Sequence, residues 1–122
     1  RRSSSPVGYA RRGKYLDRLR PFLETLDRAA IHVLLFDDLT AQDRDAMRRL
    51  FAFLGVDPDF APTAWQKPHN ASDDTFRIER ATIDALREEF REPNARLAEW
   101  LGRDLGGWNE TTPLLDRLCG DG

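Results

Sequence analysis

Several residue types are scarce in this chain, and each scarcity narrows what the protein can be. Cys119 is the one cysteine, so neither an intramolecular disulfide nor a structural zinc site built on cysteines is expected. The longest apolar run, residues 31–36, is interrupted by His32 and is far shorter than the ~20 residues of a membrane-spanning helix. No apolar core follows the basic opening residues as it does in a signal peptide. We therefore expect no membrane-spanning segment and a cytoplasmic location.

An excess of charge of one sign is also missing. The chain has 19 Lys and Arg against 21 Asp and Glu, a net charge of -2, whereas nucleic-acid-binding domains are usually strongly basic. We therefore expect no nucleic-acid partner. The first twenty residues are an exception, because they hold many basic residues and only one acid, Asp17. Such a segment fits an anionic ligand or partner, and equally a solvated terminus. No group of His, Asp and Glu has the spacing typical of metal ligands, so no metal is predicted.

The first half of the chain shows two helical patterns around one strand-like run. Apolar residues recur every three or four positions over residues 13–26, with Pro21 inside the pattern, where we expect a kink or a helix restart. Residues 31–36 read as a strand buried on both faces, as in a parallel sheet covered by helices. Thr40 is the expected N-cap of a helix that Gly55 ends.

The second half is predicted to be helical. Residues 77–91 have an inward apolar stripe and are expected to end before Pro93. Residues 94–101 form a short helix, Trp108 is expected to plug the fold, and residues 114–118 have room for one helical turn. One strand cannot make a sheet, since its backbone groups need partners. The partner strand could come from an oligomer or from a short strand hidden in the chain, or the chain could be the C-terminal part of a larger α/β domain.

Three sequence blocks resemble the C-terminal half of a sulfotransferase domain of the bacterial and heparan-sulfate type, over residues 11–109. The first block resembles a Gly-x-Tyr-x-x-x-Leu helix, the second a strand, an acidic-Leu turn and a helix ending in Phe-Leu-Gly, and the third a pair of closing helices. The blocks are residues 12–19, residues 31–39 with residues 47–56, and residues 86–108, the last with Phe90, Pro93-Asn94, Leu97 and Trp108.

This resemblance implies a three-layer, P-loop-like α/β domain with a central parallel sheet, mostly helical in this segment and with one clear parallel strand. It implies transfer of a sulfuryl group from 3'-phosphoadenosine 5'-phosphosulfate (PAPS) to a hydroxyl or amine of a small-molecule or carbohydrate acceptor, with no metal. Residues 1–10 are then an irregular basic segment, residues 11–109 the sulfotransferase-like part and residues 110–122 a tail.

The family's phosphosulfate-binding loop and catalytic base lie upstream of the first block, and no segment of this chain matches that loop. We therefore expect the 122 residues alone to be inactive, to need the upstream half of the same domain as a partner, and to hold no identifiable catalytic residue. A fragment, an absent internal segment and a degenerate relative are all compatible with this pattern.

Five residues are the candidates for ligand binding. Lys67 and Arg77 are expected to contact the phosphates or adenine of the cofactor, with Trp65 stacking on it, although the same residues suit an ordinary exposed loop. Arg12 and Tyr15 are expected to line the acceptor cleft, although a tyrosine at the start of an apolar stripe also suits a core.

A second hypothesis from another class is a non-catalytic helical protein-interaction module, whose Arg-rich start and exposed helices bind a partner protein. The two hypotheses differ over an anionic nucleotide site, which only the first requires. A strand edge left without its sheet also favours self-association, so a homo-oligomer is a possible state.

Overall fold

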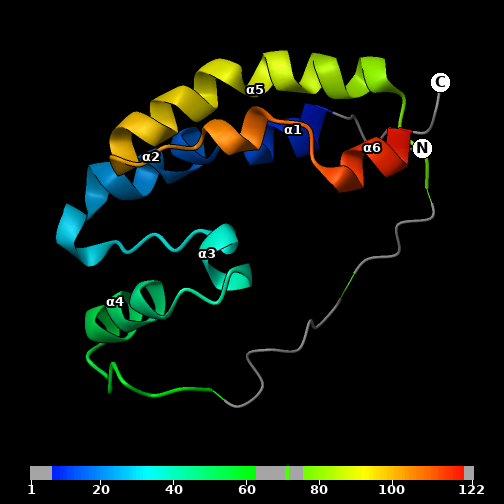
Figure 1. Cartoon of the computed structure of the whole chain (residues 1–122). Helices are drawn as coiled ribbons and strands as arrows, with labels where there is room; N and C mark the ends of the chain where they lie inside the picture. Colours follow the sequence, from blue (N-terminus) through cyan, green and yellow to red (C-terminus); the bar gives the residue numbers. More distant parts are fainter. Residues whose placement is uncertain (1–6, 63–70, 72–75, 120–122) are drawn as a thin grey trace, which may run out of the picture. The chain divides into compact units, whose positions relative to one another are not determined.

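The computed structural model describes residues 7–62, 71 and 76–119, and within them every regular element is a helix. Residues 1–24 and 73–122 make one compact unit, here called the α5 unit, and residues 25–72 make the other, the α4 unit. Figure 1 shows the elements of both units. No helix in the described ranges combines the length and the apolar character needed to cross a membrane, in line with the expectation from sequence.

Helix α5, Arg80–Leu101, is the longest element of the α5 unit. Its two buried residues, Ile83 and Leu97, lie about four turns apart and so on one face. Helices α1 (Val7–Gly13) and α2 (Tyr15–Thr25) lie alongside it in Figure 1. The chain then returns through the short 3₁₀ helix η2, Gly106–Asn109, and through α6, Pro113–Cys119.

Contacts distant in sequence join α6 to the start of α5. The backbone N–H of Ile78 donates to the carbonyl of Leu118 at 3.0 Å, and Leu118 itself is buried. The Arg80 guanidinium lies 3.4 Å from the Asp116 carboxylate. These contacts hold the C-terminal helix against the rest of the unit. Helix α6 has seven residues and is therefore longer than the single helical turn that the sequence predicts at residues 114–118.

The expected break before Pro93 is wrong, because α5 continues through it. A proline removes a single backbone donor and typically costs about 3 kcal/mol inside a helix. Ile83 precedes Pro93 and Leu97 follows it, and burial of both side chains on one face stabilises a continuous helix. Helix α2 likewise runs through Pro21, and the restart falls earlier, at Lys14, between α1 and α2. Helix α1 begins at Val7, inside the segment expected to be irregular.

The α4 unit consists of short elements. The 3₁₀ helix η1, Arg28–Ala30, leads into the extended residues 31–35, and α3, Phe36–Thr40, and α4, Arg44–Leu54, follow. Asp43, not Thr40, is the N-cap of α4: its carboxylate accepts hydrogen bonds from the N–H groups of Asp45 and Ala46 at 3.0 and 3.2 Å. Gly55 ends the helix with φ of 73°, which confirms the predicted left-handed stop.

The predicted parallel strand, and with it the α/β fold class, is contradicted. Ile31 and Leu35 do have extended backbones, with φ/ψ of -121°/121° and -79°/137°. Yet the described residues form no strand, because a strand requires a hydrogen-bonded ladder and none of the described segments pairs with this one. The apolar, β-branched pattern therefore predicted the local conformation and could not predict its pairing.

The cores of both units are small. In the described parts of the chain, the buried hydrophobic residues are Leu35 and Ala46 in the α4 unit and Ile83, Leu97, Leu105 and Leu118 in the α5 unit.

Candidate functional site

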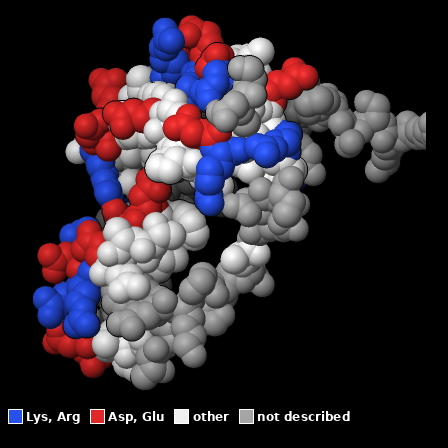
Figure 2. Space-filling view, turned by 45° about the vertical axis from the view of Figure 1, so that its right-hand side comes forward, with Lys and Arg blue, Asp and Glu red and all other residues white. Residues whose placement is uncertain are grey.

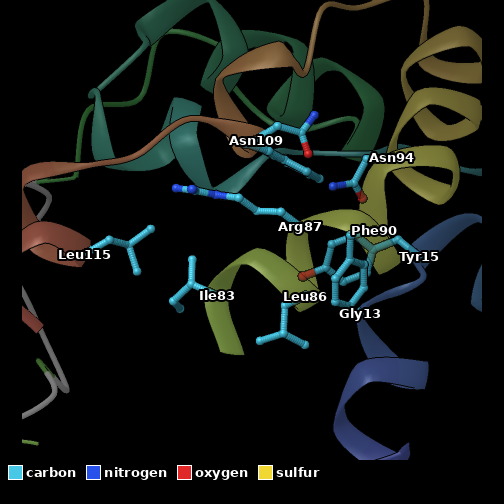
Figure 3. A pocket seen from close by; sticks show the side chains of 10 residues that line it. Gly13, Tyr15, Ile83, Leu86, Arg87, Phe90, Asn94, Asn109 and Leu115 are labelled. Atoms are coloured by element: carbon cyan, nitrogen blue, oxygen red, sulfur yellow. The ribbon is translucent and has the colours of Figure 1, made fainter. Parts of the chain in front are cut away.

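The α5 unit contains a pocket of about 330 Å³, a size within the range of small-molecule sites. Figure 3 shows it from close by. Helix α5 provides one wall, the junction of α1 and α2 a second, and η2 and α6 a third. Its lining residues are Gly13, Tyr15, Ile83, Leu86, Arg87, Phe90, Asn94, Trp108, Asn109 and Leu115.

The α1–α2 junction approaches α5 closely because Gly13 has no side chain. A Cβ atom at this position would lie 2.9 Å from both Cε1 and Cζ of the Phe90 ring, closer than real Cβ atoms come. Helix α1 ends at this glycine and α2 begins two residues later. The Lys14 ammonium between them lies 3.2 Å from the Glu89 carboxylate, a second link between the junction and α5. The glycine of the Gly-x-Tyr pattern is therefore a packing requirement.

Aromatic rings dominate the pocket. Tyr15 and Trp108 meet edge to face, with ring centroids 6.1 Å apart and planes at 76°. This geometry is one that aromatic pairs prefer. Tyr15 is nevertheless 52% exposed, and Trp108 and Phe90 are half-buried, so the rings keep surface available to a ligand. The expectation that Trp108 plugs the fold is thus met in part: it closes one side of a pocket.

The polar groups of the pocket are one guanidinium and two amides. The Arg87 side chain extends from α5 away from Phe90 (Figure 3). Its Nη2 donates to the Thr111 hydroxyl at 2.8 Å, and its Nη1 lies 3.6 Å from the Asp84 carboxylate. Asn94 is half-buried on α5, and Asn109 is exposed in η2. The lining residues that the structure describes thus include hydrogen-bonding amides and a cation, and no carboxylate or histidine.

The structure places the five predicted ligand-binding residues differently. Tyr15 lines the pocket. Arg12 is exposed on α1 and is not among the lining residues. Arg77 is exposed ahead of α5, where its Nη1 donates to the carbonyl of Arg117 at 2.7 Å, and it does not line the pocket either. Trp65 and Lys67 lie outside the described residues.

Sequence reasoning missed the polar residues of α5 as site residues. Ile83, Arg87, Phe90 and Asn94 follow one another at steps of four, three and four, the spacing of a single helix face. This signal was present, but the expected break at Pro93 assigned Asn94 to a different helix from the other three.

Charges are mixed on the face of the molecule that Figure 2 shows, where Lys and Arg alternate with Asp and Glu and neither sign forms a continuous field. Ion pairs also form within α5 itself, as between Arg91 and Glu88 at 2.6 Å. Over the described residues, no three His, Cys, Asp or Glu side chains gather in a way that could hold a metal ion.

Comparisons of the chain with protein-family models, with curated proteins and with solved structures give no match. A function for the chain therefore has to be inferred from the pocket and from the residues that line it.

Proposed function

We propose that this chain is the C-terminal part of a PAPS-dependent sulfotransferase and that its pocket holds part of the acceptor. One observation carries the proposal: two separate sequence blocks of the resemblance meet around one pocket. Gly13 and Tyr15 come from the first block, and Phe90, Asn94 and Trp108 come from the third. Residues that are about 75 or more positions apart by their numbers thus line a common cavity, which is the arrangement of a binding site as well as of a core.

The pocket supplies binding and not the transfer chemistry. Tyr15 and Trp108 offer ring surface on which an acceptor can pack, and the amides of Asn94 and Asn109 can hydrogen-bond its hydroxyl or amine groups. Sulfuryl transfer also requires a base to take the acceptor's proton and a cradle of donors for the phosphosulfate. None of the described lining residues is a lysine, histidine or carboxylate, so we propose that these groups come from elsewhere in the same polypeptide.

The roles proposed for the cofactor-binding residues stay predictions. The exposed Arg77 guanidinium suits a phosphate, and one of its N–H groups already donates to the Arg117 carbonyl. Cofactor contacts by Lys67 and Trp65 are proposed on the resemblance alone.

The test is a transfer assay on the reading frame that contains these residues, with radiolabelled PAPS and a panel of phenols, alkanols and amino- and hydroxyl-bearing oligosaccharides. We expect the 122 residues alone to be inactive and the longer polypeptide to label at least one acceptor class. Tyr15→Ala should raise KM for the acceptor about tenfold, as loss of one packed aromatic of roughly 1.4 kcal/mol would. Phe22→Ala is the matched control, since Phe22 is a similarly exposed aromatic of α2 that does not line the pocket.

Absence of labelled product with every acceptor, from a longer polypeptide that folds, would contradict the proposal. So would an upstream sequence without a strand followed by a turn rich in Lys, Ser, Gly and Thr.

A non-catalytic interaction module is the second candidate, and one observation favours it. The described part of the α4 unit leaves six large hydrophobic residues exposed, Leu26, Phe36, Phe53, Leu54, Val56 and Phe60. Exposed apolar surface of this kind is typical of protein-binding faces. A chain that binds neither PAPS nor any acceptor, and that remains folded on its own, would favour this candidate.

A further inference from the structure

The pocket of the α5 unit has an aromatic side and a cationic side. In Figure 3, Tyr15 and Phe90 lie on one side of the lining side chains and the Arg87 guanidinium lies on the other. Arg87 is also the one charged side chain among the lining residues that the structure describes. A ligand that fills the pocket therefore meets ring surface at one end and a positive charge at the other.

The Arg87 guanidinium has donors left for a ligand. Its Nη2 donates to the Thr111 hydroxyl at 2.8 Å, and its Nη1 lies 3.6 Å from the Asp84 carboxylate. A guanidinium has five N–H groups, so several remain beyond these two contacts. The Arg87 side chain is 24% exposed, whereas that of Asp84 is 63% exposed, so water screens the Asp84 charge more strongly. An anionic group in the pocket can therefore accept hydrogen bonds from Arg87.

We propose that this pocket binds a hydroxyaryl alkanoate, which is a single hydroxylated aromatic ring joined through a short chain to a carboxylate. The ring packs on Tyr15 and Phe90, the carboxylate accepts from Arg87, and the hydroxyl group bonds to the Asn94 amide, one helical turn beyond Phe90. The volume of about 330 Å³ is small for a ligand site and suits one ring with a short chain. The role of this ligand as the sulfuryl acceptor rests on the proposed function, whereas its binding does not.

Two other acceptor classes fit the described lining less well. An aliphatic amine is an ammonium ion at neutral pH, and none of the described lining residues is a carboxylate that could pair with it. Arg87 would repel such a cation. An uncharged sugar can hydrogen-bond to Asn94 and Asn109, but it offers the guanidinium no anionic partner and so gains no charge-assisted hydrogen bond. The charge of the lining therefore favours an anionic ligand.

Titrations followed by nuclear magnetic resonance test the charge preference with three ligands that share one para-hydroxyphenyl ring. Para-hydroxyphenylpropanoate is an anion, its carboxamide is neutral and tyramine is a cation. We expect the anion to bind the chain about tenfold more tightly than the carboxamide, because its hydrogen bond to Arg87 is charge-assisted, and tyramine to bind most weakly. The bound anion should shift the backbone amide signals of Arg87 and Asn94 and the indole N–H signal of Trp108.

Three variants of α5 locate the source of the preference. Arg87→Gln should bring the affinities for the anion and the carboxamide to within about twofold of each other, since the charge is lost. Arg91→Gln is the matched control and should keep the full ratio, because Arg91 is 71% exposed, pairs with Glu88 and does not line the pocket. Asp84→Asn should raise the ratio about threefold, because the competing carboxylate is removed. This exposed position keeps the test available if Arg87→Gln fails to fold.

Tyramine that binds as tightly as the anion, or an anion preference that survives Arg87→Gln, would overturn the proposal. A folded chain whose pocket signals do not shift at millimolar concentrations of the anion would overturn it too. The transfer assay is scored separately. Binding of the anion in the expected order without any labelled product would contradict the proposed function alone, whereas labelling of amines or oligosaccharides without binding of the anion would contradict this inference alone.

Discussion

The α5 unit and the α4 unit differ in how they use their apolar residues. The α5 unit holds four of the buried hydrophobic residues that the structure describes, and residues far apart in sequence fasten it, such as Lys14 with Glu89 and Arg87 with Thr111. The described part of the α4 unit holds two buried hydrophobic residues, and its links are local, such as that of Arg48 to Asp59 at 3.4 Å. Contacts between distant residues therefore fasten the α5 unit, whereas the described part of the α4 unit has fewer buried hydrophobic residues, and both units leave large hydrophobic side chains exposed.

The largest expected effect tests whether stability resides in the α5 unit. Leu97, which is 3% exposed, should cost about 2–5 kcal/mol of unfolding free energy when replaced by alanine. Leu54→Ala is the matched control, because Leu54 is 59% exposed on α4 and the change should stay within about 0.5 kcal/mol. Urea unfolding followed by circular dichroism measures both. Equal losses for the two variants would erase the distinction between the units.

The second prediction concerns the close approach at the pocket. Gly13→Ala should destabilise the chain by about 1–3 kcal/mol, because the added methyl group meets the Phe90 ring. Gly107→Ala is the matched control, since nothing lies within 4 Å of a Cβ there. Thermal unfolding compares them. Phe90→Leu should recover part of the loss in the double variant, and a Gly13→Ala chain as stable as the control would show that the junction has room.

The third prediction compares how the two main helices begin. Asp43→Ala should destabilise α4 by about 1 kcal/mol, since the carboxylate caps two N–H groups. Glu79→Ala at the corresponding position of α5 should have a smaller effect, because the Glu79 side chain makes no capping hydrogen bond. Hydrogen exchange of the first-turn amides of each helix is the measurement. A larger change at α5 than at α4 would contradict the assignment of the caps.

The smallest expected effect comes from the ion pair between Lys14 and Glu89. Its side chains are 29% and 44% exposed, so Lys14→Gln should cost at most about 1 kcal/mol, and less as salt is added. Arg48→Gln in the α4 unit should cost less still, because Arg48 and Asp59 are 58% and 74% exposed. Unfolding at low and at high salt separates the two. A loss that salt does not change would mean that the lysine acts through its aliphatic stem.

Local patterns in the sequence predicted much of this structure. The period of apolar residues located α2, α4 and α5, and Gly55 was recognised as a helix stop because only a left-handed backbone suits that position. Proline was given too much weight, since the cost of one missing donor is local and the burial of Ile83 and Leu97 on one face is shared along the helix.

The lack of a partner strand for residues 31–35 among the described residues could not be predicted, and neither could most of the pocket. An apolar run favours extended backbone, but its hydrogen-bond partner is a property of another segment. Tyr15 was identified through a motif, and the period of α5 places Arg87 on one face with Ile83 and Phe90. Asn109 joins them through tertiary packing that periodicity does not encode.

The contact between Gly13 and Phe90 also limits which substitutions these two positions can accept during evolution. A descendant that acquires any side chain at position 13 must move or shrink the side chain at position 90, or lose the approach of α1 to α5. The two positions should therefore change together across related chains, and a relative with alanine at the first should carry a smaller residue at the second.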